Sequence, residues 1–295
     1  MAKSSKTIRK RIKSVGSTKK ITRTMEMVAS SKLGRTQGRV VGSRPYTTTL
    51  GALLEAISGA VGQLGSFPLF EKRTPTRRVL VFLLTSNRGL CGGYNSNLIR
   101  KGREHVAALR AEGLEVVLHV AGRKGVAALK FAGIAMAATR TDLSDRPTFP
   151  EAESVGAPLL EAFLKNDVDR VDVVYADFRS VAQQPPTVLT LLPLGSSQGA
   201  APDGAKAPRA EEFLFEPLPQ DILGEMAQVY VKNVLYRTLL SAVASEQLAR
   251  RVAMKNATDN ASDMQHNLTR EYNKARQAMI TQEIAEIVGG AAALE

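Results

Sequence analysis

Residues 225–288 form a stretch of 64 residues without glycine or proline, and this stretch constrains the fold more than any other feature of the chain. A continuous helix of this length would span about 96 Å, several times an ordinary domain helix. Its apolar and small residues recur at alternating spacings of four and three, as one face of a helix requires. They include Leu268, Tyr272, Ala275 and Met279, followed by Ile280, Ile284 and Ile287. Because isolated helices owe most of their stability to packing, we expect a second long helix or a docked partner protein.

The N-terminal 44 residues supply a candidate for the second helix, since they contain no proline. Their apolar residues form two triplets, each stepped by four and three: Ile8, Ile12 and Val15, then Ile21, Met25 and Val28. The step between the triplets is six residues and lies close to Gly16, which predicts a slip of register and a local disturbance of the supercoil. We therefore predict an antiparallel coiled coil of the N- and C-terminal helices with the middle of the chain inserted between them.

The middle of the chain changes its hydrophobic period and predicts an α/β domain. Short apolar runs predict strands at residues 79–85, 115–121, 171–177 and 187–192, and helical patterns lie between them at residues 97–111, 123–131 and 152–165. This alternation favours a Rossmann-like, mostly parallel sheet with helices on its faces. A further strand is expected at residues 211–215, and the Gly-, Ala- and Pro-rich residues 195–210 are expected to form a flexible loop. The expected domains are an N-terminal shaft helix at 1–60, an α/β domain at 76–219 and a C-terminal shaft helix at 220–295.

The charge of the chain is concentrated at its N-terminus. Residues 1–44 contain 13 Lys or Arg and one acid, Glu26, so this segment accounts for the whole net charge of +12. Such a block indicates either a solvated surface or contact with a polyanion or an acidic protein. A basic coiled-coil protein that binds nucleic acid is therefore an alternative, but the segment has no aromatic residue before Tyr46 for base stacking. No apolar run approaches 18 residues, so we expect no membrane span.

Motifs for bond chemistry are weak in this sequence. The glycine-rich turn NRGLCGGYN at residues 87–95 follows a strand, yet it has neither the dinucleotide nor the P-loop spacing, so we expect it to serve tight strand-to-helix packing. Cys91, the only cysteine, is expected to be a small buried residue and forms no disulfide. The three histidines are too scattered for a metal site. We therefore expect no catalytic residue, no cofactor and no metal.

Several segments in order along nearly the whole chain resemble the gamma subunit of bacterial F-type, proton-translocating ATP synthase. They are IRKRIKSVGSTKKITRTMEMVASSKL (8–33), SRPY (43–46), SNRGLCGGYNSNL (86–98), SEQLARRVAMKNATDNA (245–261) and YNKARQAMITQEIAEIVGGAAA (272–293). The last segment contains the pattern Ile-Thr-x-Glu, a second acid three residues on, and Gly-Ala. Its members here are Ile280, Thr281, Glu283, Glu286, Gly290 and Ala291.

The resemblance implies a non-catalytic rotor. In this family the terminal helices form a central shaft inside a ring of alpha and beta subunits, and the α/β domain forms a foot with the epsilon subunit on the membrane c-ring. Rotation of the c-ring by ion flux turns the shaft, which drives the catalytic beta subunits through their cycle of ATP synthesis or hydrolysis. The partners implied are the alpha, beta, epsilon and delta subunits and the c-ring, with no nucleic acid. The location implied is peripheral, on the cytoplasmic face of the bacterial inner membrane.

The resemblance also assigns contact residues. The beta-subunit contacts implied are Lys19, Lys20, Arg23 and Met25 on the N-terminal helix and Arg276, Gln277, Thr281 and Glu283 on the C-terminal helix. The contacts implied with epsilon and the c-ring are Arg44, Tyr46, Phe213, Phe215 and Glu216. Each could instead be an ordinary solvated position.

Overall fold

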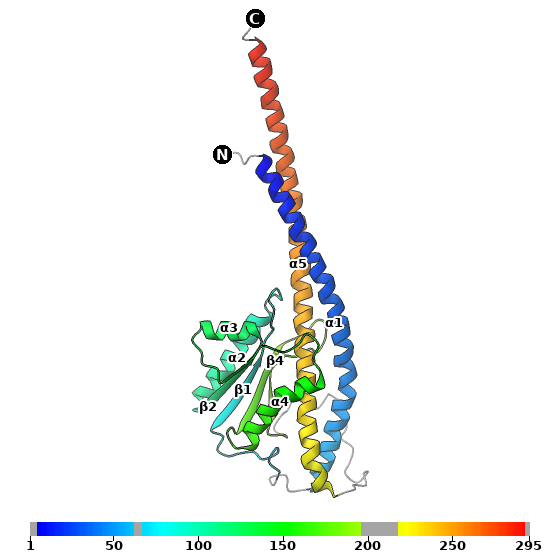
Figure 1. Ribbon diagram of the computed structural model, residues 1–295, viewed down its shortest axis with the longest axis vertical. Helices are drawn as coiled ribbons and strands as arrows, with labels where there is room; N and C mark the ends of the chain where they lie inside the picture. The colour runs from blue at the N-terminus through cyan, green and yellow to red at the C-terminus, as the bar shows by residue number, and fades with distance from the viewer. Residues whose placement is uncertain (1–4, 62–66, 196–217, 293–295) are drawn as a thin grey trace. The chain divides into compact units, whose positions relative to one another are not determined.

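The computed structural model describes residues 5–61, 67–195 and 218–292. The described chain divides into two compact units. The end unit contains residues 5–30 and 250–292, and the domain unit contains the described residues between 31 and 249. The two longest helices, α1 (Ser5–Val61) and α5 (Pro219–Ala292), run through both units (Figure 1). The expected fold class, long terminal helices with an inserted α/β domain, is confirmed.

The domain unit contains a five-stranded sheet in the order β3-β2-β1-β4-β5. The strands are β1 (Arg78–Leu84), β2 (Glu115–Ala121), β3 (Ala138–Arg140), β4 (Arg170–Ala176) and β5 (Pro186–Leu192). All neighbouring pairs are parallel except β4 with β5, which is antiparallel. Four of the strands lie where the sequence predicts them. The three-residue β3 was not predicted, because so short a strand has no apolar run to reveal it.

Helices cover both faces of this sheet (Figure 1). They are α2 (Tyr94–Ala111), α3 (Arg123–Phe131) and α4 (Phe149–Leu164), together with the parts of α1 and α5 that belong to the domain unit. Alternate residues of β1 belong to two different hydrophobic clusters. Leu80, Phe82 and Leu84 pack with residues of α1, α4 and α5. Val79, Val81 and Leu83 pack with residues of α2 and α3. Burial on both faces explains why β1 reads as a continuous apolar run.

Helix α1 continues through Pro45, beyond the proline-free N-terminal segment. A proline in a helix cannot donate a hydrogen bond to the carbonyl four residues earlier, here that of Val41. Both positions are exposed, so water can solvate the freed carbonyl. The helix therefore tolerates this proline.

Residues 196–217 lie outside the described residues. They include the expected strand at 211–215 and all but the first residue of the expected loop at 195–210.

Candidate functional site: the paired helices and the exposed end of α5

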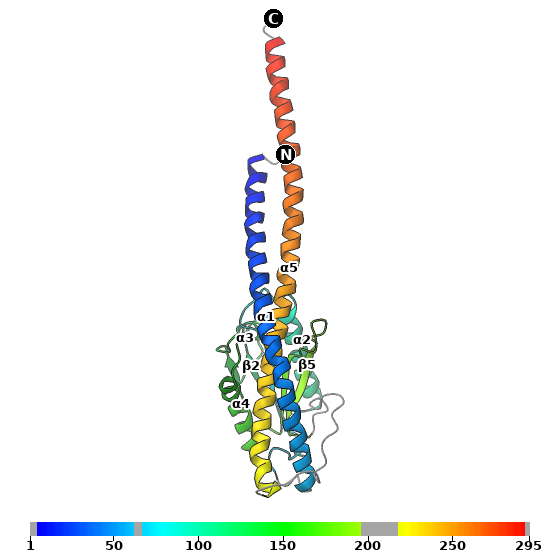
Figure 2. The same ribbon diagram turned by 90° about the vertical axis from the view of Figure 1, so that its right-hand side faces the viewer.

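In the end unit, α1 and α5 lie side by side and antiparallel (Figures 1 and 2). The seam positions of α1 repeat every seven residues at Ile8, Val15, Thr22 and Ala29, of which Val15 is half-buried and the other three are buried. The corresponding positions of α5 are Met254, Thr258, Ala261, Gln265, Leu268, Tyr272 and Ala275, spaced by three or four. This is the repeat of a coiled-coil seam.

The predicted slip of register near Gly16 is wrong. Ile21 is 61% exposed, whereas the neighbouring Thr22 is 9% exposed and occupies the seam. The step from Val15 is therefore seven residues and the repeat is unbroken. The prediction counted only apolar side chains, but a threonine can enter a seam when its hydroxyl has a partner. Val28 is likewise 51% exposed and the small Ala29 is buried in its place.

Thr22 meets Thr258 across the seam, with 2.8 Å between their Oγ1 atoms. Each hydroxyl also lies near a carbonyl of its own helix, Thr22 at 3.1 Å from that of Lys19 and Thr258 at 2.8 Å from that of Met254. Since two hydroxyls supply two hydrogens, two of these three hydrogen bonds form at one time. The seam therefore contains a satisfied polar layer, and the seven-residue spacing through Thr22 was the signal that could have revealed it.

This contact and a second one fix the antiparallel register. A Cβ added to Gly16 would lie 3.5 Å from the amide nitrogen of Gln265, so Gly16 faces Gln265 as Thr22 faces Thr258. In an antiparallel pair, each residue back along α1 is matched by one residue forward along α5. Extending the register in this way places Ser5, the first described residue of α1, opposite about Ala275. No described residue of α1 lies alongside the rest of α5, residues 276–292, which at 1.5 Å per residue is about 25 Å long.

The four predicted contact residues of α5 all lie on this last stretch. Arg276, Gln277, Thr281 and Glu283 are exposed, and the Thr281 hydroxyl donates to the backbone carbonyl of Gln277 at 3.0 Å. The apolar residues of the same stretch are exposed as well. They are Met279, Ile280, Ile284, Ile287 and Val288, between 45% and 72% exposed. An unpaired helix with apolar and polar groups both open to solvent is suited to a surrounding protein partner.

The predicted contacts of α1 in the end unit do not share one face. Lys20 and Arg23 are exposed, while Lys19 and Met25 are half-buried. At about 100° per residue, Lys19 and Arg23 lie on one side of the seam position Thr22 and Met25 lies on the other. Lys19 and Arg23 can therefore contact one partner surface together, and Met25 flanks the opposite side of the seam.

The remaining predicted contacts belong to the domain unit or are not described. The Arg44 guanidinium donates at 3.4 Å to the carbonyls of Phe178 and Arg179, and Tyr46 is 58% exposed. Phe213, Phe215 and Glu216 lie outside the described residues. The structure thus places Arg44 against the segment after β4 and leaves Tyr46 open to solvent.

The glycine-rich turn packs the sheet against its helices, as expected. The turn leads from β1 into α2, and hydrogen bonds join its first residue and the two residues after β1 to the starts of α2 and α3. The backbone N–H of Arg123 donates to Asn87 Oδ1 at 3.0 Å, that of Gly125 to Thr85 Oγ1 at 3.0 Å, and that of Ser86 to Asn95 Oδ1 at 3.0 Å. A Cβ on Gly122, whose φ is +97°, would lie 2.2 Å from the carbonyl oxygen of Thr85.

Cys91 in the same turn is 2% exposed, which confirms the prediction of a small buried residue. Asn95 Nδ2 donates to its sulfur at 3.2 Å.

Within the described ranges, no three His, Cys, Asp or Glu side chains are grouped as a metal ion would need. No described helix is long and apolar enough to cross a membrane.

Sequence reasoning missed the polar contacts that join α1 to the α/β domain within the domain unit. Lys32 Nζ forms an ion pair with Asp145 at 2.6 Å. The Arg39 guanidinium donates to the carbonyl of Pro147 and, at 2.8 Å, to the hydroxyl of Tyr236 on α5. These partners are more than 100 residues away in sequence, so no local pattern could have revealed them. Part of the N-terminal charge therefore serves internal contacts.

Comparison with known proteins gives a consistent result over the whole chain. The model of the ATP synthase family (ATP-synt) matches residues 4–294. The chain is 44% identical to the ATP synthase gamma chain of Gemmatimonas aurantiaca over 291 residues, which cover 98% of each chain. It is 40% identical to that of Leptospira biflexa, over 97% of this chain and 98% of the relative.

Solved structures share the fold. A chain in the cryo-EM structure of the Euglena gracilis mitochondrial ATP synthase, OSCP/F1/c-ring in rotational state 3, matches with a TM-score of 0.68 and 22% identity. The match covers 98% of this chain and 94% of that one. A chain in the central stalk and c-ring of the Tetrahymena thermophila mitochondrial ATP synthase matches with a TM-score of 0.57 and 24% identity, over 80% and 99% of the two chains.

Proposed function

The chain belongs to the family of ATP synthase gamma chains, and we propose that it is the central rotor shaft of an F-type ATP synthase. In this role it couples ion-driven rotation of the c-ring to the conformational cycle of the catalytic beta subunits. Its partners are the alpha, beta, epsilon and delta subunits and the c-ring. It is a peripheral subunit on the cytoplasmic face of the bacterial inner membrane. The comparisons give no support to the alternative of a nucleic-acid-binding protein.

The observation that carries this proposal is the change from two helices to one along the end unit. The α1–α5 pair is joined by a regular seam as far as about Ala275, and no described residue of α1 pairs with residues 276–292 of α5. The lone part exposes Ile284, Ile287 and Val288. Such a surface is unfavourable in water and favourable inside a protein sleeve. A ring of alpha and beta subunits supplies such a sleeve.

The paired part is suited to carrying torque. Two helices in one seam resist twisting and bending more than one helix does, and the Thr22–Thr258 bond opposes sliding of one helix along the other. Each charge that crosses the membrane releases about 2.3 kcal/mol per 100 mV, so several crossings must be collected for one ATP. The shaft holds this energy as elastic twist between the steps of the beta subunits. It performs no bond chemistry itself.

The polar and charged residues of the shaft make its contacts with the beta subunits depend on the angle of rotation. Arg276, Gln277, Thr281 and Glu283 present hydrogen-bonding groups along the lone part of α5, and Lys19, Lys20 and Arg23 present positive charge on α1. As the shaft turns, each beta subunit meets a different set of these groups. Each beta subunit is thereby biased toward a different conformation at each angle.

A rotation assay tests the proposal directly. Cys91 is buried, so a cysteine introduced as Lys130→Cys on the exposed end of α3 provides the accessible thiol for attaching a bead. The labelled chain is reconstituted with the alpha and beta subunits of the same organism, and the ring is fixed to a surface. We expect the bead to rotate in one direction when ATP is added and to stop when ATP is removed. A chain that fails to assemble with alpha and beta, or a bead that stays still during ATP hydrolysis, contradicts the rotor function.

A further inference from the structure

The domain unit contains an open, positively charged cleft of about 830 Å³, which we call the basic cleft. One wall is α1, and the others are the turn after β1, the start of α3 and the segment after β3. The charged residues that line it are Lys32, Arg35, Arg39, Arg88, Arg123, Arg146, Asp142 and Asp145. Six cations against two carboxylates leave an excess of positive charge, which attracts anionic partners.

The two acidic residues are already engaged by neighbouring cations. Asp142 accepts from the Arg140 guanidinium at 2.7 Å, and this hydrogen bond holds the pKa of Asp142 below its usual value. Asp145 forms the ion pair with Lys32 at 2.6 Å and lies 3.8 Å from the Arg88 guanidinium. Neither carboxylate is within ion-pair distance of Arg35, Arg123 or Arg146, and in the described part of the chain no hydrogen bond or ion pair engages the side chains of these three arginines.

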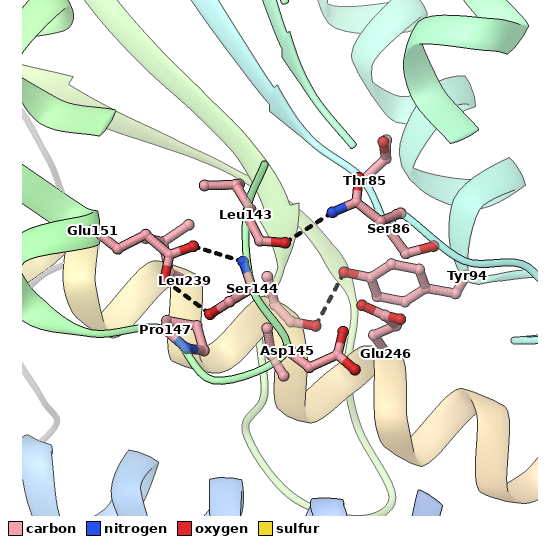
Figure 3. Close-up of a pocket in the computed structure, with 13 residues that line it drawn as sticks. Thr85, Ser86, Tyr94, Leu143, Ser144, Asp145, Pro147, Glu151, Leu239 and Glu246 are labelled. Carbon is pink, nitrogen blue, oxygen red and sulfur yellow. Dashed lines mark hydrogen bonds between the residues drawn. The ribbon is translucent and has the colours of Figure 1, made fainter. Parts of the chain in front are cut away.

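The segment after β3 that lines the cleft is held in place by hydrogen bonds, as Figure 3 shows for Leu143, Ser144 and Glu151. Glu151 accepts from the Ser144 backbone N–H at 2.6 Å and from the Ser144 hydroxyl at 3.0 Å. Asn87 Nδ2 donates to the carbonyl of Leu143 at 2.8 Å. The segment that carries Asp145 and Arg146 is thus fixed from both sides before any partner binds, which lowers the entropic cost of binding.

The chemistry of the cleft selects among possible anions. No aromatic residue is among those that line it, so it has no surface on which to stack a nucleotide base. The backbone N–H groups of Arg123 and Gly125 at the start of α3, where a phosphate would bind, donate instead to Asn87 and Thr85. What remains are guanidinium groups, whose planar forks match carboxylates in a two-point geometry. The cleft is also open and long enough to be lined from α1 to α3, which suits a chain rather than a single small anion.

We propose that the basic cleft is a docking site for an acidic segment of a partner polypeptide, with Arg35, Arg123 and Arg146 as the arginines that bind its carboxylates. None of the rotor contacts Lys19, Lys20 and Arg23 is among the residues that line the cleft. It does not rest on the rotor function, because it depends only on residues of the domain unit.

The test is a binding titration of the full chain with a fluorescently labelled oligoglutamate peptide, followed by anisotropy. We expect Arg35→Gln, Arg123→Gln and Arg146→Gln together to weaken binding at least about tenfold, because three exposed charge-assisted contacts are lost. The matched control is Arg9→Gln, Lys10→Gln and Lys13→Gln, which removes the same charge from exposed positions of α1 outside the cleft. We expect this control to change the affinity less than about twofold, since distant exposed charges are screened.

Two results would overturn the proposal. Equal losses in the two triple variants would show that the peptide is attracted by the net charge and not by the cleft. An oligothymidylate of the same charge that binds more tightly than the peptide, and loses its affinity in the cleft variant, would show that the cleft prefers nucleic acid. Far-UV circular dichroism of each variant verifies that the fold is unchanged; the three arginines are exposed and hold no other part of the described chain.

Discussion

Thr22 on α1 and Thr258 on α5 share a hydrogen bond of 2.8 Å although 236 residues separate them in sequence. Both side chains are buried, at 9% and 4% exposure, in a seam that is otherwise apolar or small around them. A buried polar pair in a coiled coil fixes the register of its helices at a cost in stability. The position of this bond therefore sets which residues of α5 remain beyond the N-terminal end of α1.

The first prediction concerns this pair. Thr22→Val should cost only about 1 kcal/mol of unfolding free energy, because Thr258 still donates to the Met254 carbonyl. Thr22→Val with Thr258→Val should cost less than the sum of the two single changes, since no buried hydroxyl then remains. Urea unfolding of the wild type, both single variants and the double variant measures this coupling. Strictly additive costs would show that the bond between the two hydroxyls contributes nothing.

The second prediction concerns the lone part of α5. Arg276→Leu with Gln277→Leu removes two exposed polar groups and should lower multisite ATP hydrolysis of the reconstituted complex about fivefold, for a loss of about 1 kcal/mol of angle-dependent interaction. Helical content should not change, because both residues are exposed. The matched control is Thr269→Leu with Arg270→Leu, an adjacent exposed pair in the part of α5 that pairs with α1. Unchanged hydrolysis in the first variant would mean that this stretch is only a passive bearing.

The third prediction concerns the positive charge of α1. Reversal of Lys19, Lys20 and Arg23 to Glu should impair ATP-driven ion pumping more than assembly, whereas single alanine changes should each cost only about 0.2–1 kcal/mol. The control reverses Arg9, Lys10 and Lys13, three exposed cations nearer the start of the same helix. Pumping and subunit content are measured on the same membranes. If both triple variants pump equally well, these residues are solvated positions and not coupling contacts.

The fourth prediction is a pH dependence that arises from His119 on β2. Burial lowers the pKa of this histidine below its ordinary value of 6.5. Below about pH 6.5 the unfolded chain then binds more protons than the folded one, so the contribution of His119 to stability falls as pH falls, by at most about 1.4 kcal/mol per pH unit. His119→Gln should reduce the difference between urea midpoints at pH 7.5 and 5.5. An identical pH dependence in wild type and variant would exclude His119 as its source.

The fifth prediction separates packing from backbone strain in the turns of the sheet. Gly113 and Gly122 both have positive φ, +81° and +97°, but only Gly122 has atoms within 4 Å of the place of a Cβ. Gly113→Ala should cost about 1–2 kcal/mol for the conformation alone. Gly122→Ala should cost at least about 1 kcal/mol more, because the methyl group overlaps the Thr85 carbonyl. Thermal unfolding of the two variants compares these costs. Equal costs would show that the Thr85 carbonyl at the end of β1 shifts away from the added methyl group without loss of stability.

The sequence was most informative where the spacing of apolar residues and the length of a segment both indicate the same type of secondary structure. The proline-free stretches and the apolar runs around Val81, Leu118 and Val173 predicted the long helices and the main strands, because each element buries a face with its own repeat. The resemblance to a family then supplied the candidate contact residues. Whether Lys20, Arg276 or Tyr46 contacts a partner stays a prediction, since exposure alone is common to contact residues and solvated ones.

Elsewhere the sequence misled or was silent for identifiable reasons. Counting only apolar residues put Ile21 in the seam, whereas the hydrogen bond of Thr22 makes a polar residue acceptable there. The basic cleft was not predicted, because its arginines come from separate segments that only the fold brings together. Arg35 on α1 and Arg123 on α3 are an example. Counting charged residues along the chain gives the net charge of a segment but does not show which charged side chains lie together in the fold.

The sequence separation of Thr22 and Thr258 also has a consequence for biosynthesis. Helix α1 leaves the ribosome early, but its partner positions on α5 are made last, 236 residues later. At about 5–20 residues per second, the seam of α1 waits roughly 10–50 s for its partner. During this time Ile8, Val15 and Leu33 have no α5 to cover them, and the nascent chain is open to aggregation. Cotranslational chaperones that bind apolar helices are therefore expected to hold the N-terminal segment until synthesis ends, and the yield of folded chain should depend on them more than on the stability of the finished protein.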